Sequence, residues 1–439
     1  MTDLKRAALR IFRETLAAID IPLSMRRKLG RAGSRILVNG APFDLAAYER
    51  ISAIAIGKAS VAMARGLAEL LSPDFRVEGI VIAPSAASGL PEGFQAILAG
   101  HPVPDKASFA AAHAVLDLLA AANQHTLVFF LLSGGGSALV ELPLDASVTL
   151  EDVQAMNRAL VTCGASIDEI NAVRKHLSAV KGGRMAVAAA SAMKITLGVT
   201  DVPEGQESAL ASGPTLPDPT TVPDACGVVS RYGLLSKLPQ SIRTRFEHPN
   251  SIPETPKTGD PAFDPRRAVF QILLGRHDLF HAAHHASESE EFITVCDNST
   301  DNWPVEKAVD DLLAQLATLK QANPGKRVAV IADGEVSSPV TGDGVGGRNL
   351  AFVLDSVRKI AGQKIAVLSA GTDGIDGSSP AAGAVADGET LARAQSLGLD
   401  PADYFRRSDS YTFFRRLGDT IETGPTGNNL RDLRILLTE

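Results

Sequence analysis

The sequence predicts an α/β protein of two domains, with a parallel sheet covered by helices on both faces. Short apolar runs typical of buried strands alternate with helical stretches along the chain, and this alternation favours parallel strands joined by helical crossovers. Several of these runs end in glycine-rich turns or acidic residues, and ligands of open α/β sheets bind at the carboxyl ends of strands. The 439 residues exceed one ordinary hydrophobic core, so two domains are expected.

The first half of the chain supplies most of these elements. Residues 4–19 carry apolar side chains at a spacing of three to four, which predicts an amphipathic helix. Apolar, β-rich runs predict strands at 51–56, 79–83, 127–132 and 195–201. Helical stretches are expected at 61–70, 109–122 and 166–190. Two prolines make the segment 101–105 (HPVPD) a rigid loop.

The second half restarts the alternation, with strands predicted at 269–274, 328–332 and 365–370. Residues 249–265 are rich in Pro, Asp and Thr and poor in apolar residues, as linkers between domains commonly are. We therefore expect a first domain over residues 1–250 and a second domain over residues 260–439.

Charge and composition narrow the choice of partners. The net charge of −7 and the single tryptophan, Trp303, argue against binding of nucleic acid or of an anionic membrane. No apolar run is long enough to span a membrane, and residues 1–19 do not resemble a signal peptide. Three scattered cysteines without a CxxC pair are ordinary for a reducing cytosol. We expect a cytoplasmic protein that binds small molecules, and the composition leaves a homodimer open.

The first glycine-rich turn directly follows the predicted strand at 127–132. It consists of Ser133, Gly134, Gly135, Gly136 and Ser137. Backbone N–H groups that converge in such a turn, next to the start of a helix, favour an anion such as phosphate. The alternative is a plain tight turn between strand and helix, which glycine also permits.

Lys58 occupies a similar position after the predicted strand at 51–56, in the sequence Gly-Lys-Ala-Ser. A lysine at a turn from strand to helix is well placed to bind a phosphate. The turn is not a Walker A loop, because Ala53 stands where that motif requires a glycine. The alternative is a solvated lysine in a loop.

The helical stretch at 166–190 concentrates cations in an acidic protein. Asn171 and Lys175 share a helical face, with Arg174 beside them and Lys181 beyond. The cluster predicts residues that bind an anion, and a solvated helix face is the alternative.

Two acidic residues at predicted strand ends are candidate metal ligands. Asp201 ends the strand at 195–201, where an acid/base role is the alternative, and Asp373 follows the strand at 365–370. Hard carboxylates suit Mg²⁺, which usually keeps several waters and bridges phosphates. The alternative for Asp373 is ordinary turn chemistry, because Asp-Gly is common in turns.

The second glycine-rich turn spans 341–349 and ends in Arg348 and Asn349. Glu335 precedes it, at the end of the predicted strand at 328–332. Strand ends of the second half thus deliver carboxylates beside a loop that bears an arginine, which predicts a second charged site.

Six motifs resemble the MOFRL-type glycerate 2-kinases, in the family's order, and the resemblance covers nearly the whole chain. They lie at 131–139 (LLSGGGSAL), 171–184 (NAVRKHLS with KGGR), 211–215 (ASGPT), 346–349 (GGRN), 370–374 (AGTDG) and 423–429 (TGPTGNN).

The resemblance implies ATP-dependent phosphorylation of D-glycerate to 2-phosphoglycerate with Mg²⁺. It also implies a larger N-terminal Rossmann-like domain, a smaller C-terminal α/β domain of the MOFRL type, and an active site in the cleft. The family's expected catalytic lysine and arginine fall on Lys58 and Arg348, and Asp201 or Asp373 would hold Mg²⁺. The expected nucleotide- or substrate-binding residues are Ser133, Gly134, Gly135, Gly136, Ser137, Asn171, Arg174, Lys175, Lys181, Glu335 and Asn349.

Three departures from the family pattern leave a related hydroxy acid open as the substrate. Residues 200–207 read TDVPEGQE where the family usually has Ser-Asp-Val-x-Gly-Asp, so the second acid is displaced. Residues 334–337 read GEVS, with serine in place of the usual threonine, and residues 275–278 read GRHD where Gly-Ser-Asn is commoner.

Two other classes of function compete with a kinase. Members of this family have carried the name hydroxypyruvate reductase, and Gly342, Gly344 and Gly347 match the fingerprint of NAD(P)H-binding proteins. That match is isolated, because no clean strand precedes it and no acidic residue ends a strand about twenty residues later. The third class is a sensor of sugar acids that kept the fold without activity, and the sequence adds no DNA-binding module to support it.

Overall fold

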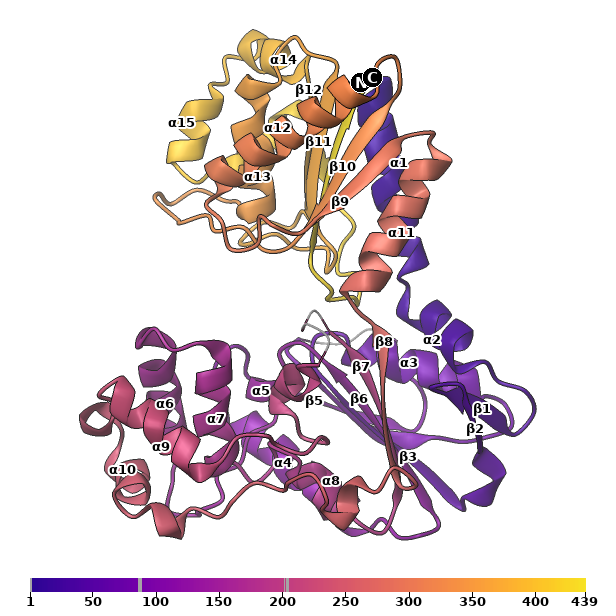
Figure 1. The fold of residues 1–439 in the computed structure, drawn as a ribbon, viewed down its shortest axis with the longest axis vertical. Coiled ribbons are helices and arrows are strands. Elements are labelled where there is room, and N and C mark those ends of the chain that lie inside the picture. The colour runs from indigo at the N-terminus through magenta and orange to yellow at the C-terminus, as the bar shows by residue number, and fades with distance from the viewer. Residues whose placement is uncertain (1, 86–88, 201, 203–204) are drawn as a thin grey trace. The chain divides into compact units, whose positions relative to one another are not determined.

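The computed structural model describes residues 2–85, 89–200, 202 and 205–439. It contains two compact units, each built on a six-stranded sheet (Figure 1). The larger unit comprises Ile21–Leu273, and the smaller unit combines Met1–Asp20 with Leu274–Glu439. The predicted α/β class is confirmed for both.

The sheet of the larger unit reverses its winding direction between two central strands. Its strands are β3 (Arg50–Ile56), β4 (Glu78–Ala83), β5 (Phe94–Leu98), β6 (Thr126–Ser133), β7 (Met193–Val199) and β8 (Ala268–Leu274). Their order is β5-β4-β3-β6-β7-β8, and the strands from β5 to β7 pair in parallel. The chain winds outward from β3 to β5, and then adds β6 on the other side of β3. Crevices at such reversals are the usual ligand sites of open α/β sheets.

Helices cover both faces of this sheet. Helix α4 (Lys106–Ala120) packs its alanine- and leucine-rich side against apolar side chains of β3, β4 and β6. Helix α3 (Ser60–Leu71) contacts the same three strands. Because right-handed crossovers that run in opposite directions place their helices on opposite faces, α3 covers the other face.

The remaining elements of the larger unit lie around this sheet. The helices are α2 (Ile21–Leu29), α5 (Gly136–Leu139), α6 (Leu150–Thr162), α7 (Ile167–Leu177), α8 (Arg184–Ala188), α9 (Val222–Arg231) and α10 (Gln240–Glu247), and β1 (Arg35–Val38) pairs with β2 (Ala41–Asp44) as a hairpin. The 3₁₀ helices are η1 (Leu45–Ala47), η2 (Glu207–Ser212), η3 (Leu235–Lys237), η4 (Pro249–Ser251) and η5 (Pro261–Phe263). Helices α6, α7, α9 and α10 bury an apolar cluster of their own.

The smaller unit has a mixed sheet. Its strands are β9 (Ile293–Asp297), β10 (Val328–Asp333), β11 (Ile365–Gly371), β12 (Gly383–Asp387), β13 (Thr420–Ile421) and β14 (Asp432–Thr438), in the order β13-β12-β11-β14-β10-β9. Strand β14 lies between β10 and β11 and runs antiparallel to both, with Leu436 opposite Val330 and Val367. The C-terminal strand therefore forms the centre of this sheet.

Two helices cover one face of this sheet, and the other helices of the smaller unit cover the opposite face (Figure 1). Helix α1 (Asp3–Ala18) contacts β11, β12 and β14, and α11 (Arg276–Ser289) contacts β9 and β10. Helices α12 (Val305–Ala322) and α13 (Arg348–Lys359) share a core cluster with β10 and β14. Helices α14 (Thr390–Ser396), α15 (Pro401–Arg406) and α16 (Ser410–Leu417) complete this side.

The bounds of the units differ from the predicted domains 1–250 and 260–439. Helix α1 belongs to the smaller unit, because Ile11 and Phe12 are fully buried there and Lys5 pairs with Asp419 at 2.7 Å. The proline-rich stretch at 249–265 belongs to the larger unit, where Glu254 accepts the backbone N–H of Val222 at 2.8 Å. Long-range contacts of these segments therefore shift both bounds.

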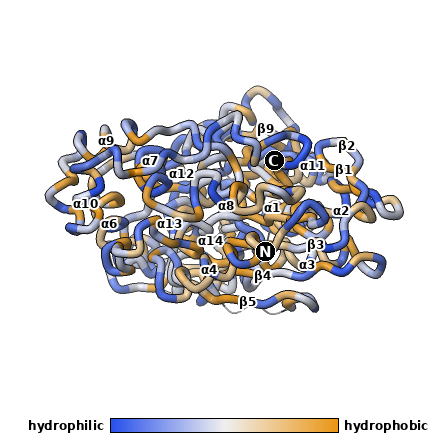
Figure 2. Tube along the Cα trace, turned by 90° about the horizontal axis from the view of Figure 1, so that it is seen from below, coloured by the Kyte–Doolittle hydropathy of each residue, from blue (hydrophilic) through white to orange (hydrophobic). Residues whose placement is uncertain are grey.

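Hydrophobic residues occur in short stretches between hydrophilic ones along the chain trace (Figure 2). Across the residues that the structure describes, none of the helices combines the length and the apolar character needed to cross a membrane.

Asp419 joins two cations of the smaller unit, Lys5 at 2.7 Å and Arg393 at 3.0 Å. Asp419→Asn removes the carboxylate that contacts the buried Lys5 ammonium, and we expect it to lower the unfolding free energy by about 3–5 kcal/mol. Lys5→Met leaves Asp419 paired with Arg393 and is expected to cost much less. Urea unfolding followed by circular dichroism measures both variants, and equal shifts of the midpoint would contradict this view of the ion pair.

Candidate active site

The carboxyl ends of β3 and β6 meet where the larger sheet reverses its winding. Lys58 follows β3, and the turn from Ser133 to Ser137 ends β6, so the structure brings these two predicted features together. The N–H of Lys58 donates to the carbonyl oxygen of Gly134 at 3.0 Å. The Oγ of Ser133 accepts from the N–H of Ala59 at 3.0 Å and donates to the carbonyl oxygen of Ile56 at 3.4 Å. These bonds form a rigid frame from which the exposed side chain of Lys58 extends.

The two turns approach so closely that only glycine fits. Gly57 has a φ of +123°, and a Cβ atom there would lie 2.2 Å from Oγ of Ser133. Gly135 has a φ of +87°, and its missing side chain leaves the turn open. The first N–H groups of a helix have no partner within that helix, and α5 begins at Gly136. The anion-binding role expected of the backbone amides at this turn remains a prediction.

His101 also lies beside the glycine turn, although the sequence predicts only a rigid loop there. A Cβ atom on Gly135 would lie 3.1 Å from the imidazole ring of His101 and 3.6 Å from Cγ of Lys58. Burial and the positive charge of Lys58 both lower the pKa of His101. The structure places His101 shortly after the end of β5, much as Lys58 follows β3, but no strand was predicted there from the sequence.

A short hydrogen-bond chain connects the glycine turn to α7. The hydroxyl oxygens of Ser137 and Ser212 lie 2.8 Å apart, and Ser212 donates to Oδ1 of Asn171 at 3.0 Å. Ala211 and Ser212 have φ values of +50° and +61°. Such left-handed conformations cost about 1–3 kcal/mol in residues other than glycine and often mark functional sites. Asn171 is thus brought to the turn, through a serine that sequence reasoning did not identify.

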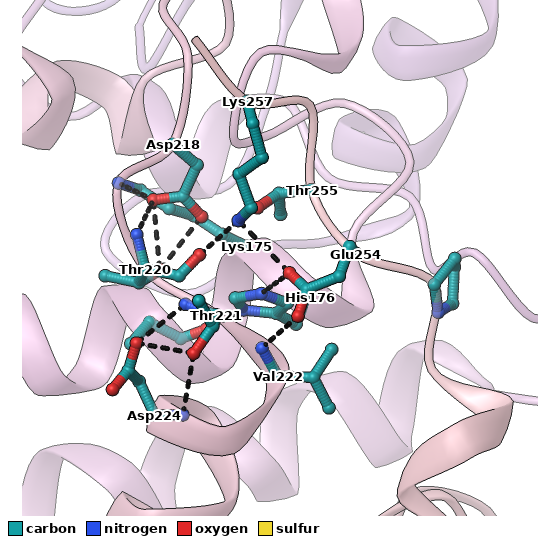
Figure 3. Close-up of polar contacts among 12 residues, drawn as sticks. Lys175, His176, Asp218, Thr220, Thr221, Val222, Asp224, Glu254, Thr255 and Lys257 are labelled. Atoms are coloured by element: carbon teal, nitrogen blue, oxygen red, sulfur yellow. Dashed lines mark hydrogen bonds and ion pairs between the residues drawn. The ribbon is translucent and has the colours of Figure 1, made fainter.

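The two predicted lysines of this region are buried against carboxylates. Lys175 lies 3.2 Å from Asp218, and Figure 3 shows this pair within a polar cluster that also joins His176 to Glu254. Lys181 contacts the carboxylate of Glu141. These ion pairs neutralise both lysines, so their contacts do not support the predicted role in anion binding, which remains a prediction.

Arg174 points to a different place from the glycine turn. Its Nε donates to Oδ1 of Asn157 at 2.7 Å, and its side chain lines a cavity of about 300 Å³ that is bordered mainly by apolar residues of α6, α7, α10 and the segments 143–148 and 251–253. A role for Arg174 in binding nucleotide or substrate remains a prediction.

Arg348 begins α13 in the smaller unit, where two carboxylates hold its guanidinium. Nε and Nη2 donate to Asp432 at 2.5 and 3.3 Å, and Nη1 donates to Glu335 at 2.7 Å. Burial lowers the pKa of Arg348, but the two carboxylates outweigh burial and raise that pKa above its usual range. Within the described residues, these bonds use three of the five N–H groups of the guanidinium. The predicted residues Glu335 and Arg348 are therefore in contact, and Asp432 is a partner that the sequence did not reveal.

Asn349 is buried beside Arg348 and anchors the start of α13. Its Nδ2 donates to Asp376 at 3.3 Å, and its Oδ1 accepts from Ser369 at 2.6 Å. Asp376 also accepts the backbone N–H groups of Asn349 and Leu350, and burial raises the pKa of Asp376 to about 7. These contacts fix the helix that carries Arg348, and a ligand contact by Asn349 remains a prediction.

The two predicted metal ligands have different outcomes. Asp201 lies outside the described residues. Asp373 lies in the turn after β11, and the nearest oxygens of Asp373 and Asp432 are 2.9 and 3.5 Å from the position that a Cβ atom on Gly371 would take. Two carboxylates thus border one small space, and Mg²⁺ commonly takes one or two carboxylates together with phosphate oxygens, so these residues fit the ion. In the described part of the chain, no group of three or more His, Cys, Asp or Glu side chains is arranged to hold a metal.

An exposed lysine beside a glycine turn, at the reversal point of a doubly wound sheet, defines an α/β protein suited to anionic small molecules. Comparison with known proteins shows to which family within this class the chain belongs. Residues 7–247 match a domain family of unknown function, DUF4147, and residues 328–432 match the MOFRL family. D-glycerate 2-kinase of Thermotoga maritima is 32% identical over 99% of this chain and 98% of that protein. The chain belongs to the family of MOFRL-type glycerate kinases.

Other similar proteins include a kinase and a protein named for a different reaction. Glycerate 2-kinase of Pyrococcus horikoshii is 30% identical over 99% of this chain and 97% of that protein. A protein of Agrobacterium vitis named putative hydroxypyruvate reductase is 37% identical over 88% of this chain and 87% of its own length. The crystal structure of Thermotoga maritima glycerate kinase matches with a TM-score of 0.85 and 32% identity, over 99% of both chains.

Gly57→Ala tests whether the two strand ends must approach this closely. Its Cβ atom would lie 2.6 Å from the backbone oxygen of Ser133, and overpacking of this kind costs about 1–3 kcal/mol. Gly227→Ala in α9 is the control, because nothing lies within 4 Å of its Cβ position. We expect thermal unfolding to show a lower melting temperature for Gly57→Ala and an unchanged or higher one for the control. A Gly57→Ala protein as stable as the control would mean that the turns are not held in contact.

Proposed function

We propose that this protein transfers the γ-phosphoryl group of ATP to the 2-hydroxyl group of D-glycerate and so forms 2-phosphoglycerate. The observation that carries the proposal is the junction of two strand ends in the larger unit, where Lys58 after β3 lies beside the glycine turn at 133–137 after β6. Such a pairing suits the phosphates of ATP or the carboxylate of glycerate. Relatives named glycerate kinase supply the class of reaction.

Catalysis in this proposal consists mainly of positioning and charge neutralisation, as in other phosphoryl transfers. Lys58 would neutralise charge that develops on the transferred group. Arg348 would donate hydrogen bonds through the N–H groups that Asp432 and Glu335 leave over, while these carboxylates fix its orientation. The backbone amides of the glycine turn would donate hydrogen bonds to an anionic oxygen, and the glycines have no side chains that would block access to it.

In this proposal Mg²⁺ would neutralise negative charge on the phosphates, in addition to Lys58. Asp373 and the neighbouring Asp432 would hold the ion, and a bound Mg²⁺ would neutralise phosphate oxygens. The assignment of Asp201 as a ligand rests on its place at the end of a predicted strand, because Asp201 lies outside the described residues. Small molecules as partners and a cytoplasmic location complete the proposal, on the basis of the acidic composition and the three cysteines, which are free thiols.

The alternative of a hydroxypyruvate reductase rests on the glycines of the 341–349 turn and on the names of some relatives. Packing within the smaller unit explains these glycines. A Cβ atom on Gly344 would lie 2.4 Å from Cβ of Asp409, and one on Gly347 would lie 2.4 Å from Cγ of Asp376. Because close approach to protein atoms accounts for them, they give little support to a dinucleotide site, and the kinase is favoured.

Two assays separate these functions. The first follows 2-phosphoglycerate formed from D-glycerate, ATP and Mg²⁺, and the second follows oxidation of NADH with hydroxypyruvate. We expect turnover in the first assay only. Turnover in the second assay alone would establish the reductase, turnover with another hydroxy acid alone would change the substrate, and inactivity in all would favour a binding protein.

Lys58→Met and Arg348→Met are each expected to lower kcat by roughly two to four orders of magnitude, because removal of such a charge clamp costs about 3–5 kcal/mol in the transition state. Steady-state kinetics measure the loss, and thermal unfolding checks that both variants fold.

Matched controls are Lys237→Met in the larger unit and Arg406→Met in the smaller unit, since both side chains are exposed. These controls should keep the activity of the unaltered protein. A Lys58 or Arg348 variant with near-normal kcat would remove that residue from the mechanism.

Asp373→Asn is expected to raise the Mg²⁺ concentration needed for half-maximal activity, because the amide replaces a charged ligand by a neutral one. A titration of activity with Mg²⁺ measures this change at saturating ATP and D-glycerate. Superimposable titrations of the variant and the unaltered protein would contradict the assignment of Asp373 as a Mg²⁺ ligand.

A further inference from the structure

We propose that His101 is the general base that accepts the proton of the substrate's 2-hydroxyl group during phosphoryl transfer. The inference rests on the proposed kinase function, for which Lys58 and the glycine turn supply a cation and amide donors but no proton acceptor. His101 follows a different strand, β5, and its imidazole is a proton acceptor that lies beside the glycine turn.

The imidazole of His101 and the stem of Lys58 border the same small space. Atoms Cδ2 and Nε2 of His101 both lie 3.1 Å from the position that a Cβ atom on Gly135 would take, and Cγ of Lys58 lies 3.6 Å from that position. Gly135 is the centre of the glycine turn. An anion held by the amides of this turn would therefore have a cation and an imidazole beside it.

The loop that carries His101 is fixed at both of its ends. The N–H of Ala99 donates to Ala83 in the neighbouring strand at 3.1 Å. Asp105 caps α4, where its carboxylate accepts the N–H of Ser108 at 2.9 Å and its own N–H donates to Oγ of Ser108 at 3.0 Å. A general base must come within hydrogen-bond reach of the proton that it removes, and these bonds fix the backbone on either side of His101.

The charge state of the imidazole also suits a base. Burial and the nearby Lys58 ammonium lower the pKa of His101, so the imidazole is neutral at pH 7–8 and has a free lone pair. Among the described residues, Lys58 is the charged group that acts on it. Bound phosphates would raise this pKa during the reaction, which would strengthen the base when it is needed.

The proposed step conserves atoms and charge. The substrate's 2-hydroxyl oxygen bonds to the γ-phosphorus of ATP while Nε2 of His101 takes the hydroxyl proton. The bond between the γ-phosphorus and the bridging oxygen breaks, and ADP leaves with that electron pair. The imidazolium then returns its proton to solvent.

His101→Gln tests this role, with His113→Gln as the matched control on an exposed position of α4. Loss of a general base lowers kcat by about 10²–10⁴-fold, and we expect that loss with the KM for ATP changed only a few-fold. The acidic limb of the kcat–pH profile should disappear in His101→Gln and persist in the control. A His101→Gln protein that keeps its kcat within a few-fold, or keeps the same acidic limb, would overturn the proposal.

A second measurement tests the geometry without turnover. Titration of the imidazole signals by NMR should give a higher pKa for His101 in Lys58→Met than in the unaltered protein, because a nearby positive charge is removed. An unchanged titration would show that the two side chains are not neighbours. If the unaltered protein formed no 2-phosphoglycerate, the kinase assignment would fall together with this base, whereas an active protein with an active His101→Gln variant would refute only the base.

Discussion

The contact between the ends of β3 and β6 fixes the site of the larger unit. One serine hydroxyl, that of Ser133, links the carbonyl oxygen of Ile56 to the N–H of Ala59, and Gly57 leaves no side chain in the way. This contact falls where the parallel sheet reverses its winding, and such reversals are the usual ligand sites of open α/β sheets. The position of Lys58 beside the turn depends on it, through the bond from the N–H of Lys58 to the carbonyl oxygen of Gly134.

The two proposed catalytic cations are held in different ways. Lys58 is exposed and acts as a point charge, whereas Arg348 is fixed by Asp432 and Glu335 and has part of its charge offset by them. A guanidinium that carboxylates bind along two edges contributes more through directed hydrogen bonds than through its net charge. On this account Lys58 supplies most of the electrostatic neutralisation, and Arg348 supplies orientation. The raised pKa of Arg348 means that its proton is retained throughout.

Local patterns in the sequence were sufficient for the strands that carry the site. The runs that become β3, β6, β10 and β11 are short, apolar and bounded by glycine, so each is recognisable without its neighbours. Contacts between distant parts of the chain were not predictable in this way. Strand β14 inserts between β10 and β11 and brings Asp432 to Arg348, 84 residues earlier in the chain. The place of helix α1 in the smaller unit likewise depends on contacts with residues far along the chain, which local patterns do not predict.

The cationic face of α7 shows the limit of periodicity as evidence for a site. Helical spacing correctly groups Asn171 and Lys175, but it contains no information about Asp218, which neutralises Lys175, or Ser212, which connects Asn171 to the turn. Both partners come from later segments of the chain. His101 shows the same limit, because the sequence predicts only a rigid loop at 101–105, and both the preceding strand β5 and the proximity of His101 to Gly135 are known only from the fold.

A crystal structure of the protein with D-glycerate and a non-hydrolysable ATP analogue would show whether the glycine turn and Lys58 bind the substrates. We expect phosphate or carboxylate oxygens to accept hydrogen bonds from the amides of Gly134, Gly135 or Gly136 and to lie beside Nζ of Lys58. Both ligands ordered elsewhere, with the turn at 133–137 and Lys58 in contact with neither, would contradict this expectation.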